Sequence, residues 1–209
     1  IFLNIHYVNP FHNSRQFYPK KIIFQKSSYE VKNYFYLLPK EIYQGCLFHF
    51  HLLNSKEHFA FAQLISFDGE LLFDSNGLSI SSSDNDQESS SLAFNENLES
   101  LICWEDFRLG TEYDIYCRNL NFSINGDYNL LDEFELAGQA NTSGGNQTNP
   151  FVFSDGGSGV YSSFLVAWED SRNGVYTDIY FQELYDSQAL LTDGGELLCG
   201  ADFDQLNPK

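Results

Sequence analysis

The chain has 209 residues, enough for one large core or several small repeat units, and its 20 Phe and 13 Tyr favour strands, because flat rings pack well on a pleated sheet. The net charge is uneven: residues 1–58 carry seven Lys/Arg against three Glu, and the remainder carries four Lys/Arg against 26 Asp/Glu. So acidic a chain argues against nucleic acid as a partner, and no apolar run approaches the roughly 20 residues of a membrane span.

The first 40 residues match the rest of the chain least. Strands are predicted at 21–25 and 31–38, and Asn9-Pro10 echoes a motif that recurs later. We expect either a strand pair with an insertion or a separate packing element. The opening residues Ile1–Asn4 have neither an initiating Met nor a charged leader region, which is expected of a mature or trimmed segment of a longer protein.

A degenerate copy of a repeat follows. Its third strand, His58–Ile65, aligns with Thr177–Leu184 near the end of the chain, and this alignment puts His49 where the later copies have tryptophan. The outer strand of this copy is predicted at Glu70–Phe73. The stretch Ser79–Ser91 is rich in Ser and Asp and is predicted to be an exposed loop between units.

The clearest signal is a thirteen-residue string, W-E-D-x-R-x-G-x-x-x-D-I-Y, that occurs twice. Its shared positions are Trp104, Asp106, Arg108, Gly110, Asp114 and Tyr116 in one copy and Trp168, Asp170, Arg172, Gly174, Asp178 and Tyr180 in the other. Apolar strands on both sides of the Asp-x-Arg-x-Gly turn chemistry predict a β-hairpin. Symmetry about the glycine sets the tryptophan opposite the tyrosine in each copy, as a cross-strand aromatic pair.

The same symmetry sets Cys103 opposite Cys117. A cross-strand disulfide fits this register, and two free buried thiols are the commoner state of such residues. The four cysteines show no C-x-x-C spacing, which argues against a zinc site.

Each hairpin belongs to a larger unit. An outer strand is predicted at Asn129–Leu136 and at Gly195–Cys199, and each unit leads into Gln-x-Asn-Pro, at Gln147–Pro150 and again at Gln205–Pro208. Four strands in about 60 residues are typical of a propeller blade. The predicted fold class is therefore all-β, with about three four-stranded antiparallel blades of an incomplete β-propeller, since a closed ring needs at least four. The predicted division is an N-terminal segment at 1–40, a degenerate blade at 41–86, blades at 87–146 and 147–204, and the start of a further repeat at 205–209.

The string from Trp168 to Leu184 resembles repeats of large secreted or cell-surface proteins, which are common among exported bacterial proteins and are taken to form β-propellers. In such repeats the unit opens with Gln-x-Asn-Pro and a D-G-x-G turn, which here are Gln147–Pro150 and Asp155–Gly159. The resemblance covers residues 79–209 well and 41–78 weakly. It implies a propeller fold and an exported location, and it implies no particular reaction.

Candidate modification sites agree with export. Asn121, Asn141 and Asn146 begin N-x-S/T sequons, and two of the three share one polar loop, where a glycan has room. Together with the even number of cysteines, they indicate an oxidising compartment, outside the cell or on its surface.

Metal sites are the weaker alternative at two places. Acidic D-x-D pairs precede two unit starts, at Asp84 and Asp86 and at Asp202 and Asp204. Calcium needs six to eight oxygen ligands, so a pair of carboxylates is a beginning rather than a site. His49 and His51 lie on one face of a predicted strand, where ordinary strand histidines are the alternative to a metal pair. Calcium apart, no cofactor is expected.

No catalytic motif was found: nucleophile elbow, H-E-x-x-H, P-loop and dinucleotide fingerprint are all missing. The D-x-R positions recur in each copy, which favours a structural network in each blade over a functional ring of polar groups. The leading hypothesis is a non-enzymatic, extracellular structural or adhesive module, part of a larger cell-surface or filamentous assembly, that packs against other repeats or other copies of the protein. The alternative is a propeller that binds carbohydrate or hydrolyses glycosides.

Overall fold

The computed structural model describes residues 34–37, 45–53, 58–66, 71–81, 83–123, 127–137, 144–154 and 163–208, with the backbone alone for 34–37, 45–53, 58, 65 and 66. The regular elements of this part of the chain are all β-strands, which confirms the predicted all-β class. Among these residues no helix is long and apolar enough to cross a membrane. The strands form three antiparallel sheets, each built on a four-strand meander.

The first sheet has the strand order β1-β2-β3-β4. Its strands are β1 (Tyr34–Leu37), β2 (Gly45–Leu53), β3 (His58–Ser66) and β4 (Leu78–Ser79). Because β1 pairs with β2, this sheet begins inside the segment 1–40 that the sequence set apart. Of the outer strand predicted at Glu70–Phe73, the described residues retain a single bridge at Leu71, after which the N–H of Leu72 donates to the carbonyl of Leu64 at 2.8 Å. The strand β4 pairs with another part of β3, at Phe61 and Ala62. The side chain of Gln63 in β3 instead bonds the backbone of Phe73 and Asp74, at 3.0 and 2.9 Å.

The predicted place of His49 in the repeat is also wrong by one residue. Within the first hairpin His49 pairs with Ala62, and Phe50 pairs with Phe61, which aligns with the tyrosine of the later copies. Phe50 therefore holds the register position of the tryptophan. The cause is the turn: six residues lie between Leu52 and Phe59, whereas seven lie between the equivalent Asp170 and Asp178, and turn length sets hairpin register.

The second and third sheets repeat one pattern. In each, the outer edge consists of two short strands that pair with different halves of the third strand, and the pairing of the second short strand contains a register shift. The second sheet contains β5 (Gln87–Phe94), β6 (Glu99–Asp106), β7 (Asp114–Phe122), β8 (Tyr128–Leu130) and β9 (Phe134–Ala137). The third contains β10 (Gln147–Ser154), β11 (Phe164–Asp170), β12 (Asp178–Tyr185), β13 (Gln188–Ala189) and β14 (Glu196–Cys199). The single outer strand predicted at Asn129–Leu136 is thus divided in two.

The exposed loop predicted at Ser79–Ser91 is wrong. Ile80, Ser81, Ser90 and Ser91 are buried, and β5 already begins at Gln87. A serine-rich sequence is typical of a loop, but Ser91 lies between the second and third sheets. Its hydroxyl accepts a hydrogen bond from the Val152 backbone at 3.0 Å.

The central hairpins have the predicted register. Trp104 pairs with Tyr116, and Trp168 pairs with Tyr180, which confirms the symmetry about the glycine of each turn. A disulfide joins Cys103 to Cys117 across the second sheet.

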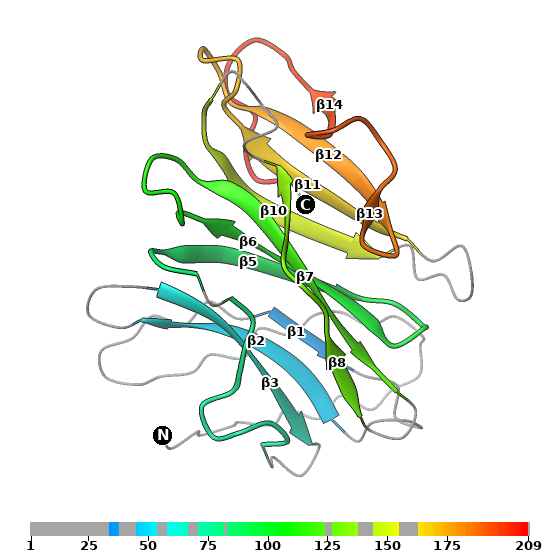
Figure 1. The fold of residues 1–209 in the computed structure, drawn as a ribbon. Coiled ribbons are helices and arrows are strands. Elements are labelled where there is room, and N and C mark those ends of the chain that lie inside the picture. Colours follow the sequence, from blue (N-terminus) through cyan, green and yellow to red (C-terminus); the bar gives the residue numbers. More distant parts are fainter. Residues whose placement is uncertain are drawn as a thin grey trace, which may run out of the picture.

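Figure 1 shows the second sheet between the other two. One apolar core joins the first and second sheets and includes Ala62, Ile102 and Trp104. Another joins the second and third sheets and includes Leu101 and Trp168. Alternation along each strand explains this: neighbouring residues such as Leu101 and Ile102 serve opposite faces, so both faces of the second sheet are buried. The three described sheets do not close into a ring.

Candidate functional site

The repeated string builds a buried hydrogen-bond network in the second sheet, which we call the repeat network. Asp106 is fully buried at the end of β6 and accepts hydrogen bonds from Trp104 Nε1 at 2.8 Å and from the backbone N–H of Arg108 at 2.8 Å. The guanidinium of Arg108 bonds the same carboxylate at 2.9 and 2.7 Å and reaches Glu133 at 2.9 Å. Its carbon lies 3.6 Å from the centre of the Tyr116 ring, within the range of a cation–π contact.

The third sheet builds the same network from the second copy of the string. Asp170 is fully buried and accepts from Trp168 Nε1 at 2.9 Å, from the backbone N–H of Arg172 at 2.9 Å, and from the Arg172 guanidinium. Arg172 lies 3.9 Å from the centre of the Tyr180 ring and bonds the carbonyl of Gly194 at 2.8 Å. These carboxylates are enclosed and occupied by their own sheets, so the geometry is that of a structural brace rather than a ligand site.

Asp114 and Asp178 begin the third strand of their sheets, and only one of them is satisfied. Asp178 accepts a hydrogen bond from Asn173 Nδ2 at 2.6 Å. The second sheet has Leu109 at the place of Asn173, and both carboxylate oxygens of the buried Asp114 lack a hydrogen-bond partner. This difference was visible in the sequence at the variable position of the two strings.

The environment of Asp114 favours its neutral form. Burial raises the pKa of Asp114 to about 7, with further contributions from the negative charges of Glu135, Glu112 and Asp106 and an opposing one from Arg108. A carboxyl group that exchanges a proton near neutral pH suits acid–base work, but the residue is only 1% exposed. No substrate reaches it in this conformation.

The D-x-D pairs lie in loops that lead into the sheets, and they do not come together. Asp84 and Asp86 precede β5, whereas Asp202 and Asp204 follow β14. The equivalent loop before β10, Gly144–Asn146, has no carboxylate of its own. The part of the chain that the structure describes contains no group of three or more His, Cys, Asp or Glu side chains placed to hold one metal ion.

The remaining predicted residues are scattered. Asn146 is exposed, and its Oδ1 accepts a hydrogen bond from the Tyr113 backbone at 2.9 Å. Asn121 is half-buried within β7, and Asn141 lies outside the described residues. His49 and His51 are alternate residues of β2, and their side chains lie outside the described part of the structure.

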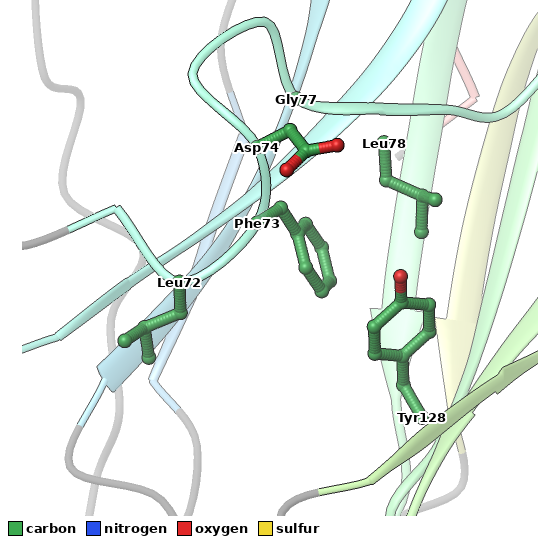
Figure 2. A pocket seen from close by; sticks show the side chains of 6 residues that line it. All are labelled: Leu72, Phe73, Asp74, Gly77, Leu78 and Tyr128. Carbon is green, nitrogen blue, oxygen red and sulfur yellow. The ribbon is translucent and has the colours of Figure 1, made fainter.

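A shallow surface depression between the first and second sheets is a candidate binding site among the described residues, and sequence reasoning missed it. It encloses about 230 Å³ and is lined by Leu72, Phe73, Asp74, Gly77, Leu78 and Tyr128 (Figure 2). The rings of Phe73 and Tyr128 meet edge to face with their centres 4.9 Å apart. Phe73 lies just before β4 and Tyr128 begins β8, so no local pattern in the sequence joins them. We call it the outer depression.

Comparisons with known proteins give little more. No family model and no curated protein matches the chain. Among solved structures, the chain is similar to the endo-arabinase from Bacteroides thetaiotaomicron VPI-5482, with 15% identity and a TM-score of 0.45 over 80% of this chain and 67% of that one. So distant a likeness assigns no role to any residue.

Proposed function

We propose that this chain is an exported repeat module that binds neutral carbohydrate in the outer depression without cleaving it. The observation that supports the proposal is the lining of the depression: two aromatic rings, Phe73 and Tyr128, beside the exposed carboxylate of Asp74. Binding sites for small molecules are mostly apolar and aromatic, with a few polar groups that set orientation. A sugar ring needs both, because it presents C–H groups on its faces and hydroxyls around its edge.

The size and charge of the depression restrict the kinds of ligand that it can bind. Its volume of about 230 Å³ is below the roughly 300–1,000 Å³ of drug-sized pockets, so a single sugar unit or the end of a glycan suits it better than a long chain. Asp74 accepts hydrogen bonds from sugar hydroxyls and repels carboxylates and sulfates. With a net charge of −18 on the whole chain, neutral glycans are the expected class.

Binding is favoured over hydrolysis by the number of carboxylates. Glycoside hydrolysis uses two of them on either side of the scissile bond, and Asp74 is the one carboxylate among the six residues that line the depression. The carboxylates of the repeat network are buried and already bonded. The structural or adhesive role expected from the repeats stays a prediction.

Export is part of the proposal. The disulfide between Cys103 and Cys117 is compatible with an oxidising compartment. The sequon at Asn146 lies at an exposed position.

A glycan array with a parallel hydrolysis readout tests the proposal. The native chain should bind one or more neutral glycans, and Tyr128→Ala should weaken binding about five- to tenfold, as loss of an aromatic contact of about 1–1.5 kcal/mol implies. Tyr185→Ala is the matched control, because Tyr185 is a similarly exposed tyrosine at the end of β12, away from the depression. Equal binding by native chain and Tyr128→Ala, or no bound glycan at all, would contradict the proposal. Release of free sugar would support the hydrolase instead.

A further inference from the structure

The interface between the second and third sheets contains a set of three hydrogen bonds, which we call the entry latch. The backbone N–H of Asn149 donates to Glu105 Oε1 at 2.7 Å, across the two sheets. The N–H of Gln147 donates to the carbonyl of Tyr113 at 2.8 Å, and the N–H of Tyr113 donates to Asn146 Oδ1 at 2.9 Å. The latch thus joins the first residues of β10 to the central hairpin of the preceding sheet.

The residues after β14 form the same latch on the third sheet. The backbone N–H of Asn207 donates to Glu169 Oε1 at 2.7 Å. The N–H of Gln205 donates to the carbonyl of Thr177 at 2.7 Å, and the N–H of Thr177 donates to Asp204 Oδ1 at 2.9 Å. All three bonds therefore recur at equivalent positions, with Asp204 in the place of Asn146.

Backbone conformation agrees with this equivalence. Asn149 and Asn207 have φ of 50° and 58°, in the left-handed region that asparagine tolerates better than most residues. In β10 this conformation lies within a register shift between Thr148 and Phe151, after which the innermost strand continues along β11. Asn207 is thus placed as the corresponding residue at the start of another innermost strand.

The face of the third sheet beside this second latch is apolar and exposed along its two edges, while Ala167 and Ile179 at its centre are buried. On the second sheet, the face that packs against the third sheet consists of Ala93, Leu101, Cys103, Ile115, Cys117, Leu136 and Ala137. The register places Phe153, Leu165, Ala167, Ile179, Phe181, Leu198 and Cys199 at the corresponding positions of the third sheet. We call these seven residues the open face. Leu136 is 7% exposed, whereas its counterpart Leu198 is 59% exposed, and Phe153 is 54% exposed.

We propose that the open face docks a further four-stranded sheet of the same repeat, whose innermost strand continues the chain from Pro208. The latch decides the source of that sheet. Because Glu169 already receives the N–H of Asn207, the place of the entering strand is taken by this chain. A second copy would have to displace Gln205–Pro208 before its own entry residues reached Glu169.

Cys199 provides a direct reporter for docking. Its thiol is exposed and free, and it pairs with Ile179 on the open face. Its counterpart on the second sheet, Ala137, is 1% exposed beneath the third sheet. Docking of a further sheet should therefore bury Cys199, and a buried thiol reacts only after the covering structure opens.

The experiment compares alkylation of Cys199 in two extended chains and in the native chain, with the modified site located by mass spectrometry. One extension is a second copy of residues 151–208 after Pro208, with serine at the copied cysteine, and the other is a Gly/Ser tail of equal length. We expect the sheet extension to slow alkylation at least about tenfold and the tail to leave it unchanged.

Two further outcomes decide the proposal. Glu169→Ala in the chain with the sheet extension should restore part of the lost reactivity, because it removes the latch bond that holds Asn207 to the third sheet, while the third sheet itself keeps its circular dichroism. Unchanged Cys199 reactivity overturns the proposal, whether the added residues fold apart or remain unfolded. Carbohydrate binding is measured separately on the outer depression, so its failure leaves this result standing.

Discussion

The strongest single perturbation that the structure suggests is Asp106→Ala. Removing this carboxylate leaves the buried Trp104 Nε1 without its acceptor, and a buried donor left unpaired costs about 1–3 kcal/mol. Arg108 also loses its nearest ion-pair partner at 2.7 Å, and breaking such a pair costs about 3–5 kcal/mol when both charges are buried. Arg108 keeps its ion pair with Glu133 at 2.9 Å and is partly exposed, so losing the pair with Asp106 should cost about 3 kcal/mol or less. We expect a total loss of about 3–5 kcal/mol.

Urea unfolding followed by tryptophan fluorescence measures the loss directly, because both tryptophans of the chain belong to repeat networks. A loss of that size is a large fraction of the roughly 5–15 kcal/mol that stabilises an ordinary domain. Asp106→Asn keeps an oxygen acceptor and the shape of the side chain, so it should cost clearly less. Asp193→Ala, at an exposed carboxylate, should stay within about 0.5 kcal/mol of the native chain. A loss below about 1 kcal/mol for Asp106→Ala would refute the argument that this carboxylate braces the sheet.

Two other changes test the electrostatics and the covalent link. The folded pKa of Asp114 is about 7 against an ordinary 3.8, so the folded chain binds more protons between these values, and the stability associated with this group is lost as pH rises through 7. Leu109→Asn supplies Asp114 with the kind of donor that Asn173 supplies to Asp178. It should therefore raise the free energy of unfolding more at pH 8 than at pH 5, by about 1.5–3 kcal/mol at pH 8. Equal stabilisation at the two pH values in urea unfolding would contradict this. Replacing Cys103 and Cys117 together by alanine should lower the free energy of unfolding by about 3 kcal/mol, because the disulfide closes a short loop in the unfolded chain. In calorimetry, reductant should destabilise the native chain but leave the double alanine variant unchanged.

The sequence predicted the central hairpins correctly because their determinants are local. The Asp-x-Arg-x-Gly turn and the apolar strands on either side lie within one short string, and turn symmetry then sets Trp104 against Tyr116. The same method failed at His49, because that hairpin has a shorter turn and the alignment carried the longer one over. Register depends on turn length, and a one-residue error moves every side chain to the other face.

The start of the second sheet was missed for a related reason. Gln87-Glu88-Ser89 takes the place of Gln147-Thr148-Asn149, and Ser89 has φ of 46°, close to the 50° of Asn149. Serine gives no sign of that left-handed conformation, whereas Asn before Pro does. A serine-rich stretch was therefore taken for a loop, although it enters a buried strand.

By itself the sequence determined the class of fold, the repeat and the pairing within each central hairpin, since all of these follow from short-range patterns of apolar residues, glycine and turn chemistry. Only the tertiary structure decided the rest. Phe73 and Tyr128 meet because the edges of two sheets lie side by side, and Glu105 bonds Asn149 across the interface of two others. The sequence shows that Leu109 gives Asp114 no donor, but only the tertiary structure shows that burial also removes the water that would otherwise solvate this carboxylate. Contacts between sheets depend on which faces pack together, and the spacing of residues in the sequence does not show which faces these are.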